Sequence, residues 1–297
     1  RCSYVGGSQR TKDGTGTVVS GAESVVHAVN PWDALGFQAV DDFMALFDQG
    51  AYAPAATRMD HTLRMVDDKT RKRELASLKK LAELYDAWDR FDHRAALNKL
   101  RDTLQSANDL RAALRDVVLF DRVFGMLKNH EEVLGPLADS RGGGLVRDLL
   151  SNARRRDNES RWDDGTARLY RAIEAMAQDK LREQHGIDNT KKIPLERVPS
   201  PLREEWQSRA RDNAVMVGLQ DAYLLLKQLG DPLGEQFFAS GLADREGSPL
   251  TSRNDSILAH GFTPISAKSF EALWRHALQL AGCTEHDLCQ FPKLTTQ

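Results

Sequence analysis

An arginine and a histidine near the C-terminal end of the chain have the residue types and spacing for RNA cleavage. In the stretch RNDSILAHG, Arg253 and His260 are separated by six residues, so on a helix their side chains point to similar sides. An imidazole with an unperturbed pKa of about 6.5 can exchange protons with the ribose 2′-oxygen or the leaving 5′-oxygen. An arginine fork can bind the charge that develops on the phosphate. The pair therefore predicts metal-independent attack of the 2′-hydroxyl on the adjacent phosphate.

The residues between the pair favour a helical setting. Ile257 and Leu258 would anchor a helix in the core, while Arg253, Asn254 and His260 face outward. The amide of Asn254 can hold a neighbouring backbone group or the histidine. The spacing alone is unspecific, because a surface arginine and a capping histidine also occur at this distance. One arginine and one histidine are few groups for an active site. A homodimer would bring two arginines and two histidines around one phosphate.

Composition bounds the class of protein. The 297 residues predict two or three structural units, and the net charge of −2 restricts any RNA contact to a local surface. The apolar runs are too short for a membrane span, which indicates a soluble protein. Cys2, Cys283 and Cys289 are not grouped with histidines at zinc-ligand spacing, which favours a reducing, cytoplasmic location. No carboxylate cluster stands out from the charged helix faces, so we expect no metal site and no cofactor.

The elements that must position the pair are helices. Residues 1–30 combine glycines with β-branched residues and are the only β-like region, whereas residues 31–140 and 145–297 show helical periodicity. The fold class is therefore mainly α, with a domain boundary expected at the glycine run of DSRGGGL, residues 139–145. The C-terminal QFPKLTTQ is expected to be irregular. The periodicity predicts helices that include residues 31–50, 52–66, 75–88, 95–104, 110–127, 145–156, 167–183, 214–229 and 267–281.

Two further sets of residues are candidates for RNA contact. The basic run Arg154 to Arg156 is expected to be a solvated helix end, with an RNA-facing patch as the alternative. In LYRAIEAMAQDKL, Arg171 and Glu174 are expected to form an ion pair at i, i+3. If this helix lines the cleft beside Arg253, Tyr170 or Arg171 could stack on the RNA or hold it.

The motif RNDSILAHG resembles, in a slightly longer form, the Arg-[Asn/Asp/His]-x4-His motif of HEPN ribonucleases. The wider chain resembles the CRISPR-associated proteins of type III systems in which a CARF sensor domain precedes a HEPN nuclease. Only the last of the similar segments is chemically specific. These segments are YVGG, GTGTVVSG, NPWDALGFQAVDDFMALFDQGAY, LYRAIEAMAQDKL and RNDSILAHGF.

The resemblance implies roles for particular residues. Arg253 and His260 would be the catalytic pair and Asn254 a supporting residue, in an enzyme that cuts single-stranded RNA as a homodimer. It also implies activation by cyclic oligoadenylate bound at the sensor domain. Residues 145–297 would then be the HEPN nuclease domain, and residues 31–140 a helical linker or adaptor domain. Residues 1–30 would be the remnant of the sensor, so that the chain resembles a C-terminal fragment.

Two other classes of function remain open on the sequence. One is a helical binding or scaffold module that keeps the HEPN shape without activity, which the absence of a basic excess and the helical block 31–140 favour. It would form a stable complex with a partner and cleave no RNA under any activator. The other is a HEPN toxin that acts by nucleotide transfer, for which the chain has no supporting motif.

Overall fold

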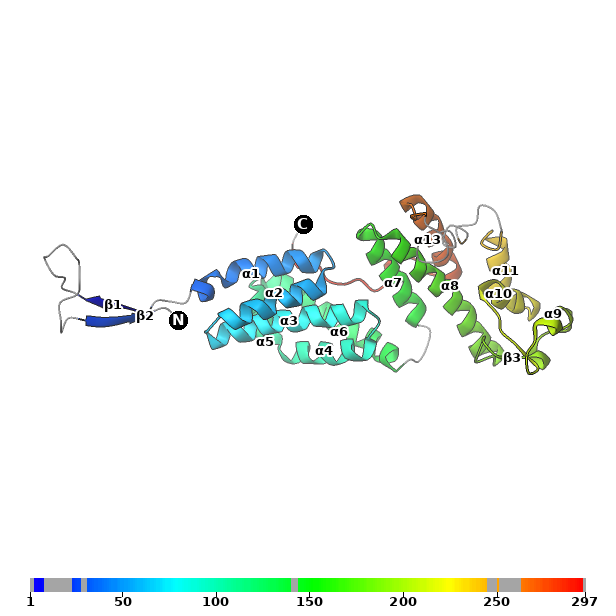
Figure 1. Cartoon of the computed structure of the whole chain (residues 1–297), viewed down its shortest axis with the longest axis horizontal. Helices are drawn as coiled ribbons and strands as arrows, with labels where there is room; N and C mark the ends of the chain where they lie inside the picture. Colours follow the sequence, from blue (N-terminus) through cyan, green and yellow to red (C-terminus); the bar gives the residue numbers. More distant parts are fainter. Residues whose placement is uncertain are drawn as a thin grey trace. The chain divides into compact units, whose positions relative to one another are not determined.

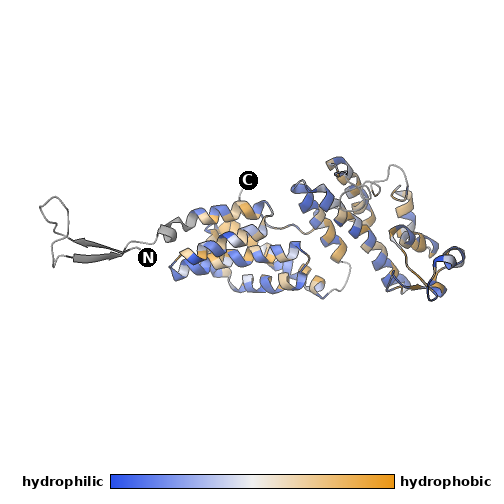
Figure 2. Cartoon of the chain, in the orientation of Figure 1, coloured by the Kyte–Doolittle hydropathy of each residue, from blue (hydrophilic) through white to orange (hydrophobic). Residues whose placement is uncertain are grey.

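The computed structural model describes residues 3–7, 23–27, 31–139, 144–244, 250 and 263–295, with side chains from residue 38 onward. The chain divides into two compact units, Arg1–Gly135 with Pro292–Gln297, and Pro136–Phe291. Both units are built from helices (Figure 1), which confirms the mainly-α fold class. The helices carry apolar residues alongside polar ones (Figure 2), as expected when one face of a helix is buried.

The N-terminal residues form a β-hairpin. Strand β1 (Ser3–Gly7) pairs antiparallel with β2 (Glu23–His27), with Val5 opposite Val25. The strand character expected of this region is therefore confirmed. Its origin as the remnant of a sensor domain stays a prediction.

The first unit continues with a series of helices. The helices expected over residues 31–50 and 52–66 are present as α1 and α2. Aspartates begin three of the later helices: the carboxylate of Asp68 accepts from the backbone N–H of Arg71 (2.6 Å), that of Asp92 from Ala95 (3.1 Å) and that of Asp116 from Leu119 (3.0 Å). The helices are α1 (Pro31–Asp48), α2 (Tyr52–Met65), α3 (Lys69–Asp89), α4 (His93–Gln105), α5 (Ala107–Leu114) and α6 (Val117–Ala138).

An aromatic cluster lies at the core of this unit. The ring of Phe47 meets those of Tyr52 and Tyr85 edge-on, with centroids 5.0 and 5.5 Å apart. The hydroxyl of Tyr85 hydrogen-bonds to Nδ1 of His130 (3.0 Å), and His130 lies edge-on to Trp88 (5.0 Å). The hydroxyl of Tyr85 and the rings of Tyr85 and Trp88 thus hold the buried imidazole, and the cluster joins α1, α2, α3 and α6 in one core.

The C-terminal tail also belongs to the first unit. The carboxylate of Asp48, at the end of α1, accepts from the backbone N–H groups of Leu294 (2.6 Å) and Thr295 (2.8 Å). Arg122 donates to the carbonyl of Lys293 (2.8 Å), and the side chain of Leu294 is 1% exposed. The tail is irregular as expected, yet it is fixed by hydrogen bonds and by burial, and the chain passes between the two units twice.

The second unit is centred on three long helices, α7, α8 and α13, which contact one another. Helix α10 also packs on α8. The hydroxyl of Tyr223 in α10 donates to the carbonyl of Ile173 in α8 (2.7 Å). The ring of Tyr223 stacks on Phe237 of α11 with centroids 3.9 Å apart. The helices are α7 (Gly144–Asn158), α8 (Trp162–His185), α9 (Ser200–Trp206), α10 (Leu219–Gln228), α11 (Pro232–Ala239) and α13 (Ala267–Ala281).

A second short strand pair corrects two expectations. Strand β3 (Ile193–Pro194) pairs antiparallel with β4 (Ala214–Val215), so residues 1–30 are not the only β region. The helix expected from Ala214 begins instead at Leu219. The apolar run AVMVGL was ambiguous, because short apolar runs do not separate strand from helix by periodicity. The run forms a strand because its backbone pairs with Ile193 and Pro194, which lie before α9 and outside the run itself.

A glycine fixes the close approach of α10 and α11. A Cβ atom built on Gly234 would lie 2.3 Å from the backbone nitrogen of Lys227 and 2.6 Å from its Cα. Because backbone atoms cannot rotate away, Gly234→Ala is expected to lower the free energy of unfolding by about 3 kcal/mol. Urea unfolding followed by circular dichroism measures the change. The control is Gly125→Ala in α6, where a Cβ meets nothing within 4 Å and stability should be unchanged or slightly raised. Equal stability of Gly234→Ala and the parent would contradict this packing.

Candidate functional site

The residues with catalytic chemistry in the sequence, Arg253, Asn254 and His260, lie outside the described residues. The residues that flank their segment are described. Leu250 is 6% exposed and Ile265 is 5% exposed, and both belong to the second unit. Described residues on both sides of the segment are therefore buried in this unit.

A carboxylate at the start of α8 holds the backbone of Ile265. The backbone N–H of Ile265 donates to both carboxylate oxygens of Asp163, at 3.3 and 3.4 Å, across 102 positions of sequence. Asp163 lies in the first turn of α8. The next residue, Ser266, caps α13 by accepting from the backbone N–H of Ser269 (3.1 Å). The first turn of α8 therefore fixes Ile265, and His260 lies five residues before it in the sequence.

The start of α8 lies close to α13 because of a glycine. A Cβ atom built on Gly165 would lie 2.6 Å from Cε2 of Phe270, whose ring is fully buried. Glycine at this position lets α8 and α13 approach until the ring covers its backbone. This packing and the Asp163 hydrogen bonds together hold Ile265 and the start of α13 against α8.

Buried polar side chains lie on α7, next to the first turns of α8. Asp148, Asn152 and Arg156 recur every four residues and are at most 6% exposed. Arg168 of α8 donates to the amide oxygen of Asn152 (2.5 Å) and to the carbonyl of Asp164 (2.8 Å). Buried polar groups cost free energy unless they are hydrogen-bonded, so this face is a specific polar layer. This layer was not predicted from the sequence, although polar side chains that recur every four residues on a helix were a usable signal.

The basic run of α7 is not a solvated helix end, so that expectation was wrong. Arg154 donates to Asp157 (2.7 Å) and to Glu285, and its guanidinium lies 4.3 Å from the centre of the Trp274 ring. Burial alone would lower the pKa of Arg154, but the hydrogen bonds to the two carboxylates raise it above its ordinary value. Arg156 is 6% exposed. Tertiary packing therefore places this run in an internal network rather than in solvent.

The ion pair expected on α8 is present. Arg171 lies 3.1 Å from the carboxylate of Glu174 and donates to the amide oxygen of Gln178 (2.9 Å). Its side chain is 45% exposed, and Tyr170 is half-buried. The structure does not bring either residue together with Arg253, because that arginine is outside the described residues. A role for Tyr170 or Arg171 in holding RNA stays a prediction.

The cysteines of the second unit are free thiols. Burial raises the pKa of Cys289 to about 12, and burial also raises the pKa of Cys283. Both side chains are therefore protonated at neutral pH and are poor nucleophiles. In the described ranges, no group of three or more histidine, cysteine and acidic side chains is arranged to hold a metal ion. No helix in this part of the chain is long and apolar enough to cross a membrane.

Two family models match the chain and correspond to its two helical regions. The model described as the Csm6 6H domain matches residues 35–134, and that described as the Csm6 HEPN domain matches residues 137–283. A search of curated proteins finds no match. The fold and these matches define a HEPN-domain protein with a preceding six-helix-type domain. The chain belongs to the Csm6 family of type III CRISPR systems, as the resemblance of its motifs predicted.

The family assignment bears on function at a coarse level. HEPN domains are generally ribonucleases, and the Csm6 family belongs to CRISPR antiviral defence with RNA as its substrate. The HEPN match spans the segment that contains Arg253 and His260. Neither match reaches residues 1–30, so the assignment of these residues to a sensor domain stays a prediction.

Proposed function

We propose that the chain is a metal-independent endoribonuclease that cuts single-stranded RNA at a composite site formed by two copies. Arg253 and His260 of each copy carry the reaction and Asn254 supports them. The observation that carries this proposal is the HEPN match over residues 137–283, because it includes the only Arg–His motif with the required chemistry that we identified in the sequence.

The reaction uses a nucleophile that the substrate contains. The 2′-oxygen attacks the adjacent phosphorus while the bond to the 5′-oxygen breaks. His260 exchanges protons with these two oxygens, and the guanidinium of Arg253 binds the non-bridging oxygens. The products are a 2′,3′-cyclic phosphate and a 5′-hydroxyl, so no water and no metal-bound hydroxide is needed.

The proposal includes regulation and assembly. A homodimer supplies the second half of the site, and cyclic oligoadenylate bound to a CARF sensor domain activates cleavage in the cytoplasm. These parts rest on the family resemblance. The domain boundaries that go with them are residues 1–30 for the sensor remnant, 31–140 for the adaptor and 145–297 for the nuclease, whose last residues from Pro292 pack with the first unit.

The product ends test the proposed reaction. We expect the chain to cleave a labelled single-stranded RNA in the presence of EDTA, and mass spectrometry to find 2′,3′-cyclic phosphate ends. A single 2′-deoxy substitution at the scissile nucleotide should abolish cleavage there and leave other positions unchanged. Products with 5′-phosphates, or loss of all cleavage in EDTA, would rule out this reaction. A chain that binds a protein partner but never cleaves would instead be a scaffold.

The anchor at Ile265 gives a prediction about a positioning residue. Asp163→Ala removes the acceptor of the Ile265 N–H, and we expect kcat to fall about tenfold because the His260 segment loses its fixed end. Asp163→Asn keeps a side-chain oxygen that can accept this bond, so it should retain most of the activity. Single-turnover cleavage measures both variants.

The adjacent carboxylate provides the control for this pair. Asp164 accepts from Arg161 and Arg168, whereas Ile265 donates to Asp163, so Asp164→Ala should affect kcat less than Asp163→Ala at similar thermal stability. Equal activity of Asp163→Ala and Asp163→Asn would show that the hydrogen bond does not position the site.

A further inference from the structure

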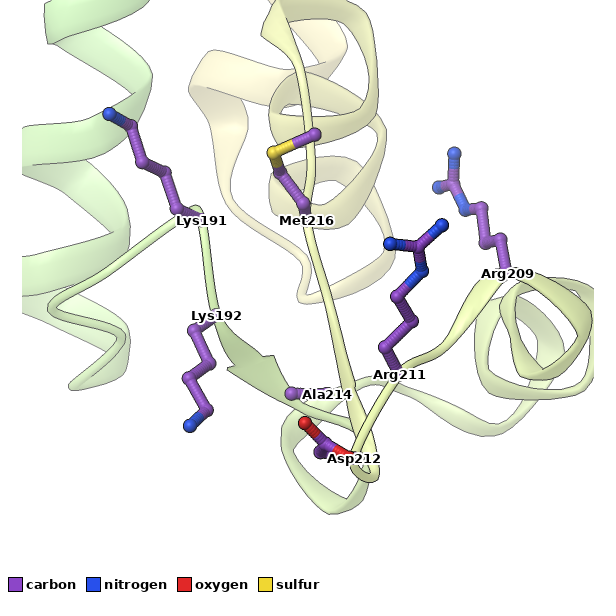
Figure 3. A pocket seen from close by; sticks show the side chains of 7 residues that line it. All are labelled: Lys191, Lys192, Arg209, Arg211, Asp212, Ala214 and Met216. Atoms are coloured by element: carbon purple, nitrogen blue, oxygen red, sulfur yellow. The ribbon is translucent and has the colours of Figure 1, made fainter.

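A basic groove lies on the second unit around the short strand pair β3–β4. It is lined by other residues than the Asp163 anchor and the polar layer of α7. It has a volume of about 660 Å³, within the roughly 300–1,000 Å³ of sites that hold small ligands. In Figure 3, Lys191 and Lys192 come from the segment before β3, Arg209 and Arg211 lie across from them, and Met216 stands between. Its lining residues are Lys191, Lys192, Arg209, Arg211, Asp212, Ala214 and Met216.

Hydrogen-bonded backbone holds both sides of the groove. Arg211 and Ala214 exchange two backbone hydrogen bonds (2.8 and 2.9 Å) around Asp212 and Asn213, which have positive φ values of 49° and 57°. Two such residues make a tight turn of the kind that Asp and Asn tolerate. On the other side, the backbone N–H of Lys191 donates to the side chain of Asn189 (2.9 Å). The cations are thus placed on an ordered frame.

Most of these cations lack a carboxylate partner. Of the four, Arg209 pairs with Asp221 (2.7 Å) and lies 4.5 Å from the centre of the Trp206 ring. Within the described ranges, Lys191, Lys192 and Arg211 form no ion pair. Elsewhere on this unit exposed cations such as Arg182 and Arg275 do pair with nearby carboxylates. Like charges held together repel, and a bound polyanion removes this repulsion.

The groove also offers surfaces for bases. The side chain of Met216 is 70% exposed, although Val215 and Val217 on either side of it are buried. The guanidinium of Arg209 lies 4.5 Å from the centre of the Trp206 ring, and arginine planes stack on unpaired bases. A row of cations beside an apolar side chain and an arginine plane fits a single strand, whose bases are unstacked, better than it fits an acidic peptide.

We infer that this groove binds the phosphate backbone of single-stranded RNA at nucleotides away from the scissile bond. Lys191, Lys192 and Arg211 contact phosphates, while Met216 and Arg209 contact bases. The groove gives an acidic chain, with net charge −2, a local surface for an anionic substrate. The inference deepens the proposed nuclease function and rests on it for the identity of the ligand.

The test measures binding separately from cleavage. The probe is a fluorescent 2′-O-methyl RNA 12-mer, which lacks the attacking hydroxyl, titrated with the full chain at several salt concentrations. In the triple variant Lys191→Gln, Lys192→Gln, Arg211→Gln we expect the affinity to fall about tenfold or more. The slope of log K against log salt should become shallower by about 2, since each lost phosphate contact contributes about 0.7.

A matched variant removes the same charge from ion-paired positions. Arg182→Gln, Lys227→Gln, Arg275→Gln eliminates three cations that already face carboxylates, so affinity and salt slope should stay near those of the parent. Equal loss in both triple variants, or loss in neither, would overturn the groove. Preferential loss of binding to a poly-glutamate peptide, with RNA binding unchanged, would also overturn it. The parent could bind RNA without ever cleaving it, while only the groove triple variant loses affinity. In that case the nuclease proposal fails, and the inference that the groove binds RNA is kept.

Discussion

His260→Ala is expected to lower the rate of RNA cleavage by about 10²–10⁴-fold, the usual contribution of a general acid–base group. The loss arises because no other group then exchanges protons with the 2′-oxygen and the 5′-oxygen. Single-turnover cleavage of a labelled RNA in EDTA, with cyclic oligoadenylate present, measures the rate. Thermal unfolding and the mass of the dimer should be unchanged, since the residue is expected to face outward.

A second histidine of the same unit serves as the control. His286 is exposed on the short helical turn Glu285–Asp287, and His286→Ala should cleave at the parent rate. If His260→Ala also cleaves at the parent rate in EDTA, the residue is not the acid–base group and the proposed site fails.

Arg253→Ala is expected to lower kcat/KM by about 10²–10³-fold, as for the loss of a donor to developing negative charge. Arg253→Lys should recover only part of this, because an ammonium keeps the charge but cannot form the two parallel hydrogen bonds of the arginine fork. Steady-state cleavage gives the values.

The matched variant is Arg275→Ala, which removes an exposed arginine that pairs with Glu271 on the same helix. It should leave kcat/KM unchanged. Full recovery by Arg253→Lys would show that a simple positive charge is sufficient at this position and would contradict bidentate binding of the phosphate.

The helices could be predicted from the sequence where apolar residues repeat over long stretches, as in α1, α3 and α13. The strand pair β3–β4 could not, because each strand has two residues and its partner lies beyond an intervening helix. The hydrogen bond between Asp48 and Leu294 of the tail could not be predicted from the sequence either, because it joins residues 246 positions apart. Local pattern thus predicts elements, whereas contacts between distant segments decide how they are held.

The candidate site was predictable to a similar degree. Arg253 and His260 stand out by residue type and spacing, and the family match now includes their segment. The anchor at Asp163 could not be predicted, because an acidic residue in the first turn of a helix has an ordinary role beside the helix dipole. For the same reason Arg154 resembled a helix-end cation until the packing of Trp274 and Glu285 gave it partners.

Mixed dimers test the composite site most directly. Chains carrying Arg253→Ala and chains carrying His260→Ala are each inactive as homodimers under this account. Co-expression with two affinity tags isolates the heterodimer, whose shared site would contain one arginine and one histidine from different copies. We predict cleavage in EDTA well above that of either mutant homodimer and below that of the parent. A heterodimer as inactive as both homodimers would contradict a site built from two copies.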